Sequence, residues 1–317
     1  MPVKVNIERV GTFKKFPNRT VQPGALPPRL NESDYLYGDL DEELDLSLGS
    51  EGFRDVGKND RYQSFFNYLR KTSPQGSSMK EVIGADFVSN RRNLLVLAKS
   101  AYDIDRMDIQ AYRQNGVIFL CDKGIDRRDN GPSYGYKFEQ YMTLGKNRLP
   151  HDKYEKVSNG SCVKAVLRTT LSSGEDQLKV LYAAEVDAID KNKNYVEIKT
   201  TGMDHDLWLE RGSLRDYLQS SLAGVPYIIY GQKRSNTPFV YETRKVYTED
   251  IPKEDVYWKK EVCYKQLFDV LQKIQSKLEY DDEAIVVKVR KDGLSFEPEC
   301  SKNCVFMDPQ FLDHFDN

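Results

Sequence analysis

Three short segments in the middle of the chain constrain its fold most, because each combines acidic residues with a strand or helix pattern. They are GYKFE at 135–139, AEVD at 184–187 and YVEIKT at 195–200. Together they supply four carboxylates and one lysine, namely Glu139, Glu185, Asp187, Glu197 and Lys199. A metal-dependent phosphodiester hydrolase needs these residue types, because carboxylates bind divalent cations and an ammonium group stabilises charge on phosphorus.

The second and third segments are predicted to lie in a β-hairpin. Residues 177–190 and 195–200 are rich in β-branched and aromatic side chains, as strands are. Residues 191–194 between them have the composition of a turn. We therefore expect the two strands to pair in antiparallel fashion.

Alternation along these strands is predicted to gather the charged groups on one face. Residues two apart in a strand share a face, so Glu185 lies beside Asp187, and Glu197 lies beside Lys199. The opposite faces are apolar, with Ala184, Val186, Ala188, Val196 and Ile198. Packing these apolar faces onto a core leaves both charged faces on the same side of the sheet.

Carboxylates on otherwise apolar strands predict a bound cation. Burying such charges is costly unless a cation or a partner offsets them. Mg²⁺ and Mn²⁺ take oxygen ligands, and two such ions about 3.5–4 Å apart activate a water and stabilise the leaving oxygen. Lys199 would orient or deprotonate that water, or neutralise charge on phosphorus.

Taken singly, each motif has a plainer explanation. An ExD alternation is common on solvated strand faces, and an EIK segment is more often a surface salt-bridge ladder. Glu139 by itself would be an exposed helical glutamate. The joint occurrence of the three segments between 135 and 200 favours the functional interpretation.

Composition excludes a general polyanion-binding surface. The 317 residues carry 47 Lys+Arg against 49 Asp+Glu, so a nucleic-acid site must be a local basic cleft. Five scattered cysteines without a CxxC pair favour reduced thiols in an intracellular protein. We find neither a secretory signal nor a stretch of about 18 apolar residues, so we expect no membrane span.

The order of elements predicts one α+β domain over 1–317, with a mixed sheet, curved or split, between flanking helices. Residues 1–57, rich in turn signals, are predicted to be an extended arm wrapping the core. Predicted helices cover 61–70, 134–144, 207–224 and 254–278. Predicted strands cover 82–88, 116–121, 177–190, 195–200, 227–231, 239–247 and 283–289. No role is predicted for the histidines, His151, His205 and His314.

The segments GYKFEQYM, EVD, YVEIKT and LQSSLAGVP together resemble, in this order, motifs of the DXO family of decapping exoribonucleases. That family includes the fungal partner of the nuclear 5′–3′ exoribonuclease. The resemblance spans roughly 80–300, the predicted catalytic core, and implies a fold like that of the PD-(D/E)XK nucleases. It implies removal of incomplete or unmethylated caps, of a 5′-triphosphate as pyrophosphate, or of NAD caps, and possible 5′→3′ degradation.

The resemblance also implies roles for individual residues. The positions of metal ligands are matched by Glu139, Glu185, Asp187, Glu197 and the backbone carbonyl of Ile198. Glu139 also matches a water ligand, and Glu185 a substrate contact. Three further matches are Lys199, which positions the nucleophile, Gln219, near the scissile phosphate, and Arg91, which contacts RNA phosphates.

Three positions depart from the family pattern. Arg92 stands where the family usually has glycine, so the motif arginine is Arg91 or its neighbour. Val96 replaces a common lysine, and Ala184 replaces a glycine before EVD. Ala184 is a small-for-small change that should fit. The carboxylates and the lysine are all present, so chemistry is expected to survive, and the altered arginine region bears on cap preference and RNA affinity.

Three functions therefore remain open. The first is a metal-dependent RNA 5′-end hydrolase using Mg²⁺ or Mn²⁺, monomeric, in the nucleus or cytoplasm. The second is a non-catalytic family member that binds and stabilises a 5′–3′ exoribonuclease; the five retained site residues argue against it. The third is a DNA endonuclease of the wider nuclease fold, which would not require the GYKFE and LQSSLAGVP segments.

Overall fold

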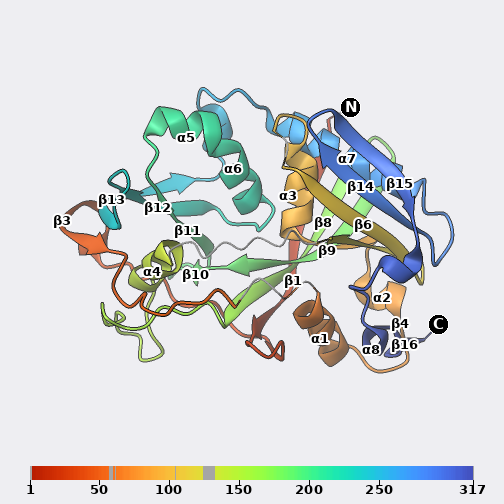
Figure 1. Ribbon diagram of the computed structural model, residues 1–317, viewed down its shortest axis with the longest axis horizontal. Helices are drawn as coiled ribbons and strands as arrows, with labels where there is room; N and C mark the ends of the chain where they lie inside the picture. The colour runs from red at the N-terminus through yellow and green to blue at the C-terminus, as the bar shows by residue number, and fades with distance from the viewer. Residues whose placement is uncertain (1, 57–59, 61, 104, 124–132, 317) are drawn as a thin grey trace.

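The computed structural model describes residues 2–56, 60, 62–103, 105–123 and 133–316. Most strands of this part belong to two sheets (Figure 1). The larger contains β1 (Lys4–Lys15), β2 (Val21–Pro23), β5 (Phe87–Asn90), β6 (Met107–Gln114), β7 (Val117–Asp122), β8 (Cys162–Ser173), β9 (Asp176–Val186), β14 (Ala284–Arg290) and β15 (Gly293–Glu299). Their spatial order is β15-β14-β6-β7-β5-β9-β8-β1-β2.

The smaller sheet has five strands in the order β10-β11-β12-β13-β3. They are β3 (Gly38–Asp45), β10 (Ala188–Ile189), β11 (Tyr195–Thr201), β12 (Tyr227–Lys233) and β13 (Phe239–Tyr247). A third, two-stranded sheet joins β4 (Ser77–Ser78) to β16 (Phe315–Asp316). Parallel pairs, such as β11 with β12 and β5 with β9, occur beside antiparallel ones, so both main sheets are mixed.

Helices cover both faces of each main sheet (Figure 1). They are α1 (Gln63–Thr72), α2 (Met79–Ile83), α3 (Arg91–Lys99), α4 (Tyr134–Tyr141), α5 (His205–Arg211), α6 (Ser213–Ser221), α7 (Lys260–Gln275) and α8 (Pro309–Leu312). Three 3₁₀-helices lie at Asp34–Leu36, Ile251–Lys253 and Ser301–Asn303. No helix in the described ranges is long and apolar enough to span a bilayer.

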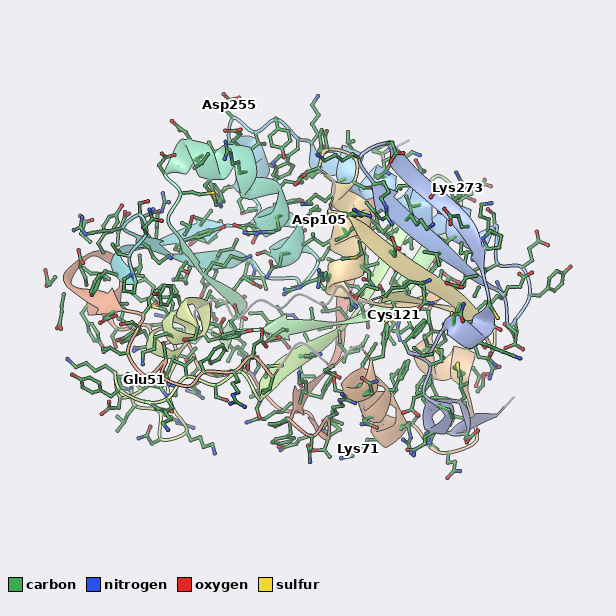
Figure 2. All side chains as sticks on the ribbon, viewed as in Figure 1. Glu51, Lys71, Asp105, Cys121, Asp255 and Lys273 are labelled. Carbon is green, nitrogen blue, oxygen red and sulfur yellow. The ribbon has the colours of Figure 1, made fainter. Side chains whose placement is uncertain are left out.

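Alternation along the strands divides the interior into separate cores. In β5, Phe87 packs in the core under α3, α6 and α7, whereas the next residue, Val88, packs with α1, α2 and α8. A third core lies between α4 and the smaller sheet, where Phe138 meets Val196 and Ile229. Figure 2 shows the side chains between these layers: Cys121 is buried, and all five cysteines are free thiols.

The predicted mixed α+β architecture with flanking helices is confirmed. The helix expected over 61–70 is α1, although residue 61 lies outside the described residues. Predictions at 116–121, 134–144, 227–231, 239–247 and 283–289 correspond to β7, α4, β12, β13 and β14. The sequence analysis did not predict β1, which pairs along its length with β8 and makes the N-terminal residues part of the larger sheet.

The predicted hairpin between 177–190 and 195–200 is mostly wrong. Only β10 pairs with β11, through Ala188 with Val196 and Ile189 with Tyr195. The long strand β9 pairs instead with β8 and β5 in the larger sheet. The chain therefore crosses from one sheet to the other at Asp187, which lies between β9 and β10. The charged groups consequently come from two sheets.

Three other boundaries differ from the predictions. The strand expected over 82–88 is the end of α2, a cap at Gly84, and the start of β5. The helix expected over 207–224 is divided at Gly212 into α5 and α6. The helix expected over 254–278 begins only at Lys260, after a 3₁₀ turn.

The helix α4 approaches strand β12 closely at Gly231, and this contact can be tested. A methyl group on Gly231 of β12 would lie 2.7 Å from the ring of Phe138 on α4. We expect Gly231→Ala to lower the free energy of unfolding by about 1–3 kcal/mol, because either the helix or the strand must move. Urea denaturation measures the change.

The matched control is Gly135→Ala on the same helix, where an added methyl group meets nothing within 4 Å. We expect this variant to be more stable by about 0.5–1 kcal/mol, the usual helix preference of alanine over glycine. Equal effects of the two substitutions would contradict the close packing of α4 on β12.

Candidate active site

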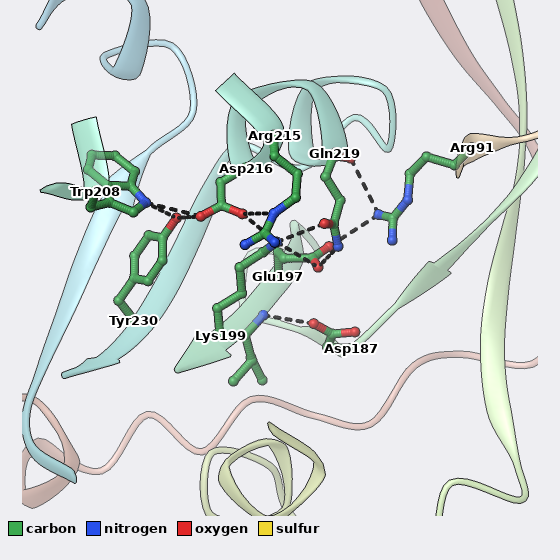
Figure 3. A network of polar contacts seen from close by, with 10 residues as sticks. Arg91, Asp187, Glu197, Lys199, Trp208, Arg215, Asp216, Gln219 and Tyr230 are labelled. Atoms are coloured by element: carbon green, nitrogen blue, oxygen red, sulfur yellow. Dashed lines mark hydrogen bonds and ion pairs between the residues drawn. The ribbon is translucent and has the colours of Figure 1, made fainter. Parts of the chain in front are cut away.

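The predicted carboxylates act on one another where the chain crosses between the two sheets, and Figure 3 shows two of them, Asp187 and Glu197. Glu185 lies near the end of β9, Asp187 at the crossing, and Glu197 in β11. Asp187 Oδ2 accepts a hydrogen bond of 2.8 Å from the backbone N–H of Ile198. This bond fixes the crossing to the middle of β11.

Glu139 reaches the same space from α4. The preceding residue, Phe138, is fully buried against the smaller sheet and sets the rotation of the helix. Burial raises the pKa of Glu139 well above its ordinary value, and the charges of Asp187, Glu185 and Glu197 add to the effect. The four carboxylates are therefore close enough to repel one another.

Asp187 experiences the same repulsion. Burial raises the pKa of Asp187 well above its ordinary value, and Glu197 and Glu185 raise it further. The hydrogen bond from Ile198 N–H and the charge of Arg91 act in the opposite direction without cancelling the rise. A shared cation would relieve this repulsion, because it favours the ionised form of each carboxylate.

The carboxylate oxygens of the site are of the type that binds a hard divalent cation. Within the described residues, no three His, Cys, Asp or Glu side chains form a ready metal-binding group. Both Glu197 and Asp187 direct carboxylate oxygens to protein donors. Mg²⁺ and Mn²⁺ nevertheless prefer oxygen ligands, which these four mutually repelling carboxylates supply. The metal-ligand roles of these residues, including the Ile198 carbonyl, stay predictions.

Glu197 is the centre of the polar contacts, and its residue is only 4% exposed. Its Oε2 accepts a hydrogen bond of 3.2 Å from Arg91 Nη1, and its Oε1 accepts one from Gln219 Nε2 (Figure 3). Arg91 Nη1 also donates to the backbone carbonyl of Gln219, at 3.3 Å. The structure thus brings two of the predicted substrate contacts, Arg91 and Gln219, to the predicted metal ligand.

Local structure explains why Arg91, and not Arg92, points inward. The strand β5 ends at Asn90, whose side chain accepts a hydrogen bond of 2.8 Å from Asn93 N–H and caps α3. Arg91 is the first residue of that helix and faces Glu197. Arg92 is exposed and lines a different cavity with Arg106.

Lys199 lies on the same side of β11 as Glu197. Its Nζ is 3.8 Å from Glu197 Oε1 and donates to Gln219 Oε1 at 2.8 Å. It also donates to Asp216 Oδ1 at 2.9 Å. The sequence analysis missed Asp216, although its spacing of three from Gln219 places both on one face of α6.

Asp216 stays ionised despite its burial. Burial alone would raise its pKa, but the charges of Lys199 and Arg215, with a hydrogen bond from Tyr230, hold the pKa below its ordinary value. The carboxylate of Asp216 therefore balances the ammonium charge of Lys199.

A cavity of about 450 Å³ opens beside the carboxylates. Glu139, Glu185 and Asp187 form part of its lining. Basic side chains form another part: Lys14, Arg29, Lys146, Arg148 and His151. We call these five residues the basic wall. The sequence does not reveal this wall, because Lys14 and Arg29 are more than 100 residues away from Lys146, Arg148 and His151 in the chain, and no role is predicted for His151.

The basic wall is available to an anion. Among the described residues, no ion pair is formed by Lys14, Arg29, Lys146 or Arg148, whereas His151 Nδ1 contacts Glu155 at 2.8 Å. Both Arg29 and Arg148 are exposed. The cavity thus combines carboxylates suited to cations with free cations suited to phosphates. It has the character of the local basic cleft that the near-neutral composition predicts for a nucleic-acid site.

The sequence matches a known family model. The model described as RAI1 like PD-(D/E)XK nuclease matches residues 8–304. The decapping nuclease dom-3 of Caenorhabditis elegans is 27% identical over 298 residues, which cover 86% of this chain and 75% of the worm protein.

Solved structures share the fold. Rai1 of Candida albicans in complex with pU5-Mn²⁺ matches with a TM-score of 0.73 at 16% identity, over 98% of this chain and 93% of that one. Rai1 of Scheffersomyces stipitis in complex with (3′-NADP)⁺ and calcium ion gives a TM-score of 0.75 at 16% identity, over 99% and 93%.

Removing one repelling carboxylate is expected to stabilise the metal-free protein. The pKa of Glu139 is raised in the folded state. The folded protein therefore loses stability as the pH increases from the ordinary pKa of a glutamate to the raised pKa of Glu139. In EDTA we expect Glu139→Gln to increase the free energy of unfolding by about 1–2 kcal/mol at pH 8, and by much less near pH 5. Urea denaturation at both pH values measures the difference.

Glu175→Gln is the matched control, because Glu175 is exposed at the turn between β8 and β9. We expect it to change stability little at either pH. Added Mn²⁺ should stabilise the unaltered protein more than Glu139→Gln. Equal stability of Glu139→Gln and the unaltered protein in EDTA at pH 8 would contradict the repulsion between the carboxylates.

Proposed function

Because this chain belongs to the family of RAI1-like PD-(D/E)XK nucleases, we propose that it hydrolyses phosphate bonds at the 5′ end of RNA with divalent cations. The family and the hydrolase class were both predicted from the motifs and are confirmed. One observation carries the finer proposal: Glu139, Glu185 and Asp187 line a cavity that also has a basic wall. The charge of the buried Glu197 acts on Glu139, and Lys199 Nζ lies 3.8 Å from Glu197 Oε1.

The relatives support the substrate class. The worm relative is a decapping nuclease, and the Candida albicans structure holds pU5 with Mn²⁺. The Scheffersomyces stipitis structure holds (3′-NADP)⁺ with calcium. For this chain we propose incomplete caps, NAD caps or a 5′-triphosphate as substrates, with possible onward 5′→3′ degradation.

The metal ions would be held by Glu139, Glu185, Asp187, Glu197 and the Ile198 carbonyl. When bound, Mg²⁺ or Mn²⁺ supplies Lewis-acid stabilisation and lowers the pKa of water. The ammonium group of Lys199, fixed by Gln219 and Asp216, lies beside Glu197 and can orient the attacking water or contact the phosphate. Arg91 extends to the same carboxylate and is placed to meet a phosphate oxygen.

The basic wall is proposed to bind the phosphates of the 5′ end. Guanidinium groups bind phosphate in bidentate fashion, and Arg29 and Arg148 present two of them. The wall draws on β1, the segment before β3 and the loop after α4. Phosphates held there would place the bond to be cleaved beside Glu185 and Asp187.

A substrate panel tests the proposal. The protein is incubated with 5′-triphosphate, NAD-capped and unmethylated-cap RNAs in Mg²⁺ or Mn²⁺. Release of pyrophosphate, NAD or a cap dinucleotide, abolished by EDTA, is the expected result. Inertness toward every RNA, with tight binding to a 5′–3′ exoribonuclease, would instead support a non-catalytic role.

Loss of one carboxylate is expected to stop turnover without unfolding the protein. Glu185→Ala or Asp187→Ala removes a proposed metal ligand, and we expect the rate to fall by about 100-fold or more. Circular dichroism and urea denaturation check the fold, and Glu175→Ala serves as the control with an unchanged rate. Normal turnover by Glu185→Ala or Asp187→Ala would refute the metal assignment.

Neutralising the basic wall is expected to weaken substrate binding. For the double variant Arg29→Gln/Arg148→Gln we expect KM for 5′-triphosphate RNA to increase about tenfold or more, with kcat little changed. The increase should be smaller for a 5′-monophosphate RNA. Arg211→Gln, an exposed arginine of α5 outside the cavity, is the control. Equal KM values for the double variant and the control would exclude the basic wall from substrate binding.

A further inference from the structure

Asp216 is a buried carboxylate, 2% exposed, whose acceptor positions are all in use. Its Oδ1 accepts from Lys199 Nζ at 2.9 Å and lies 3.4 Å from Arg215 Nε. Its Oδ2 accepts from the Tyr230 hydroxyl at 2.6 Å and from the Trp208 indole N–H at 3.0 Å (Figure 3). One oxygen therefore faces the predicted catalytic lysine, and the other is held from behind.

The contacts of Lys199 show what this arrangement determines. Its ammonium group donates two hydrogen bonds to side chains of α6, one to Asp216 Oδ1 and one to Gln219 Oε1. The distance to Glu197 Oε1 is longer, 3.8 Å. The contacts with α6 therefore set the direction in which the remaining N–H group of Lys199 faces the proposed metal site.

Trp208 and Tyr230 contact each other on the side of Asp216 that faces away from Lys199. Tyr230 lies directly opposite Lys199 in the pairing of β11 with β12. Its hydroxyl also accepts a hydrogen bond of 3.1 Å from Trp208 Nε1, and the two rings meet edge to face. Gly212 permits this position of the indole, because a methyl group there would lie 2.6 Å from Trp208 Cδ1.

Both rings are buried, Trp208 4% and Tyr230 2% exposed, and a cavity of about 220 Å³ lies against them. Their polar atoms, by contrast, are all directed at Asp216 or at each other. The hydrogen bonds from Trp208 and Tyr230 therefore orient the carboxylate of Asp216 from behind, while Lys199 contacts its other oxygen.

We propose that Asp216 is a positioning residue for the proposed hydrolysis, and that Trp208 and Tyr230 hold its carboxylate so that Lys199 faces the reacting phosphate. This inference rests on the proposed function. Asp216 acts through Lys199 and touches neither substrate nor metal. Loss of the support should lower kcat and leave KM little changed, because the basic wall still binds the 5′ end.

Two tryptophans provide a matched comparison. Both are buried, and both donate an indole N–H to a residue of α6: Trp208 to Asp216, and Trp258 to Ser213 Oγ at 2.9 Å. We expect Trp208→Phe to lower kcat by roughly 10- to 100-fold, since a small displacement of a catalytic group has effects of this size. Trp258→Phe should lower thermal stability while leaving kcat within about twofold of the unaltered enzyme.

Two tyrosines repeat the comparison with a hydroxyl group. Tyr230 donates to Asp216, whereas the hydroxyl of Tyr264 bonds with Ser221 Oγ of the same helix at 2.7 Å. Tyr230→Phe should lower kcat, and Tyr264→Phe should not. If each pair of variants loses kcat equally, or if KM alone changes, the positioning role is overturned.

A readout independent of turnover separates this inference from the proposed function. Acetylation of Lys199 by acetic anhydride, followed by mass spectrometry, reports how firmly its ammonium group is held. We expect faster acetylation in Asp216→Asn, Trp208→Phe and Tyr230→Phe than in Trp258→Phe and Tyr264→Phe. Equal rates would overturn the inference. An inactive unaltered protein with the expected acetylation pattern would instead overturn only the proposed function.

Discussion

The site depends on one hydrogen bond, from the backbone N–H of Ile198 to Asp187 Oδ2. Asp187 lies where the chain leaves the nine-stranded sheet and enters the five-stranded sheet. The bond ties that crossing to β11 and so fixes Glu185, the last acidic residue of β9, relative to Glu197. Glu185 and Glu197 are each held by a sheet that is packed on both faces. The junction at Asp187 sets the position of one relative to the other.

Charge balance then determines what the junction can do. Glu139 and Asp187 are kept from easy ionisation by burial and by their acidic neighbours. Glu197, in contrast, is bonded by Arg91 and Gln219. The cluster thus has an uncompensated acidic side, open to the cavity, and a compensated side packed against α3 and α6. Under the proposed function, a divalent cation would offset the charge on the open side, where the 5′ phosphates would also arrive.

The sequence contained the chemistry of the site but little of its geometry. Segments with alternating Glu185, Asp187, Glu197 and Lys199 identified the family, because residue types and spacing are local properties. Period-two alternation reports which residues share a face but not which strand is the partner. Only β10 forms the predicted hairpin, and β9 pairs elsewhere. Long-range contacts, such as β1 with β8 or the basic wall, leave no local pattern, so the sequence analysis missed them.

The placement of the parts suggests a division of labour between chemistry and recognition. Apart from Asp187 at the crossing, the carboxylates and Lys199 lie on strands and on α4, which pack through buried side chains such as Phe138 and Val196. Members of the basic wall such as Arg29, Lys146 and Arg148 lie outside the helices and strands. Loops tolerate substitution better than packed elements. Under the proposed function, changes in the basic wall would therefore alter which 5′ end is bound while leaving the carboxylates and Lys199 in place.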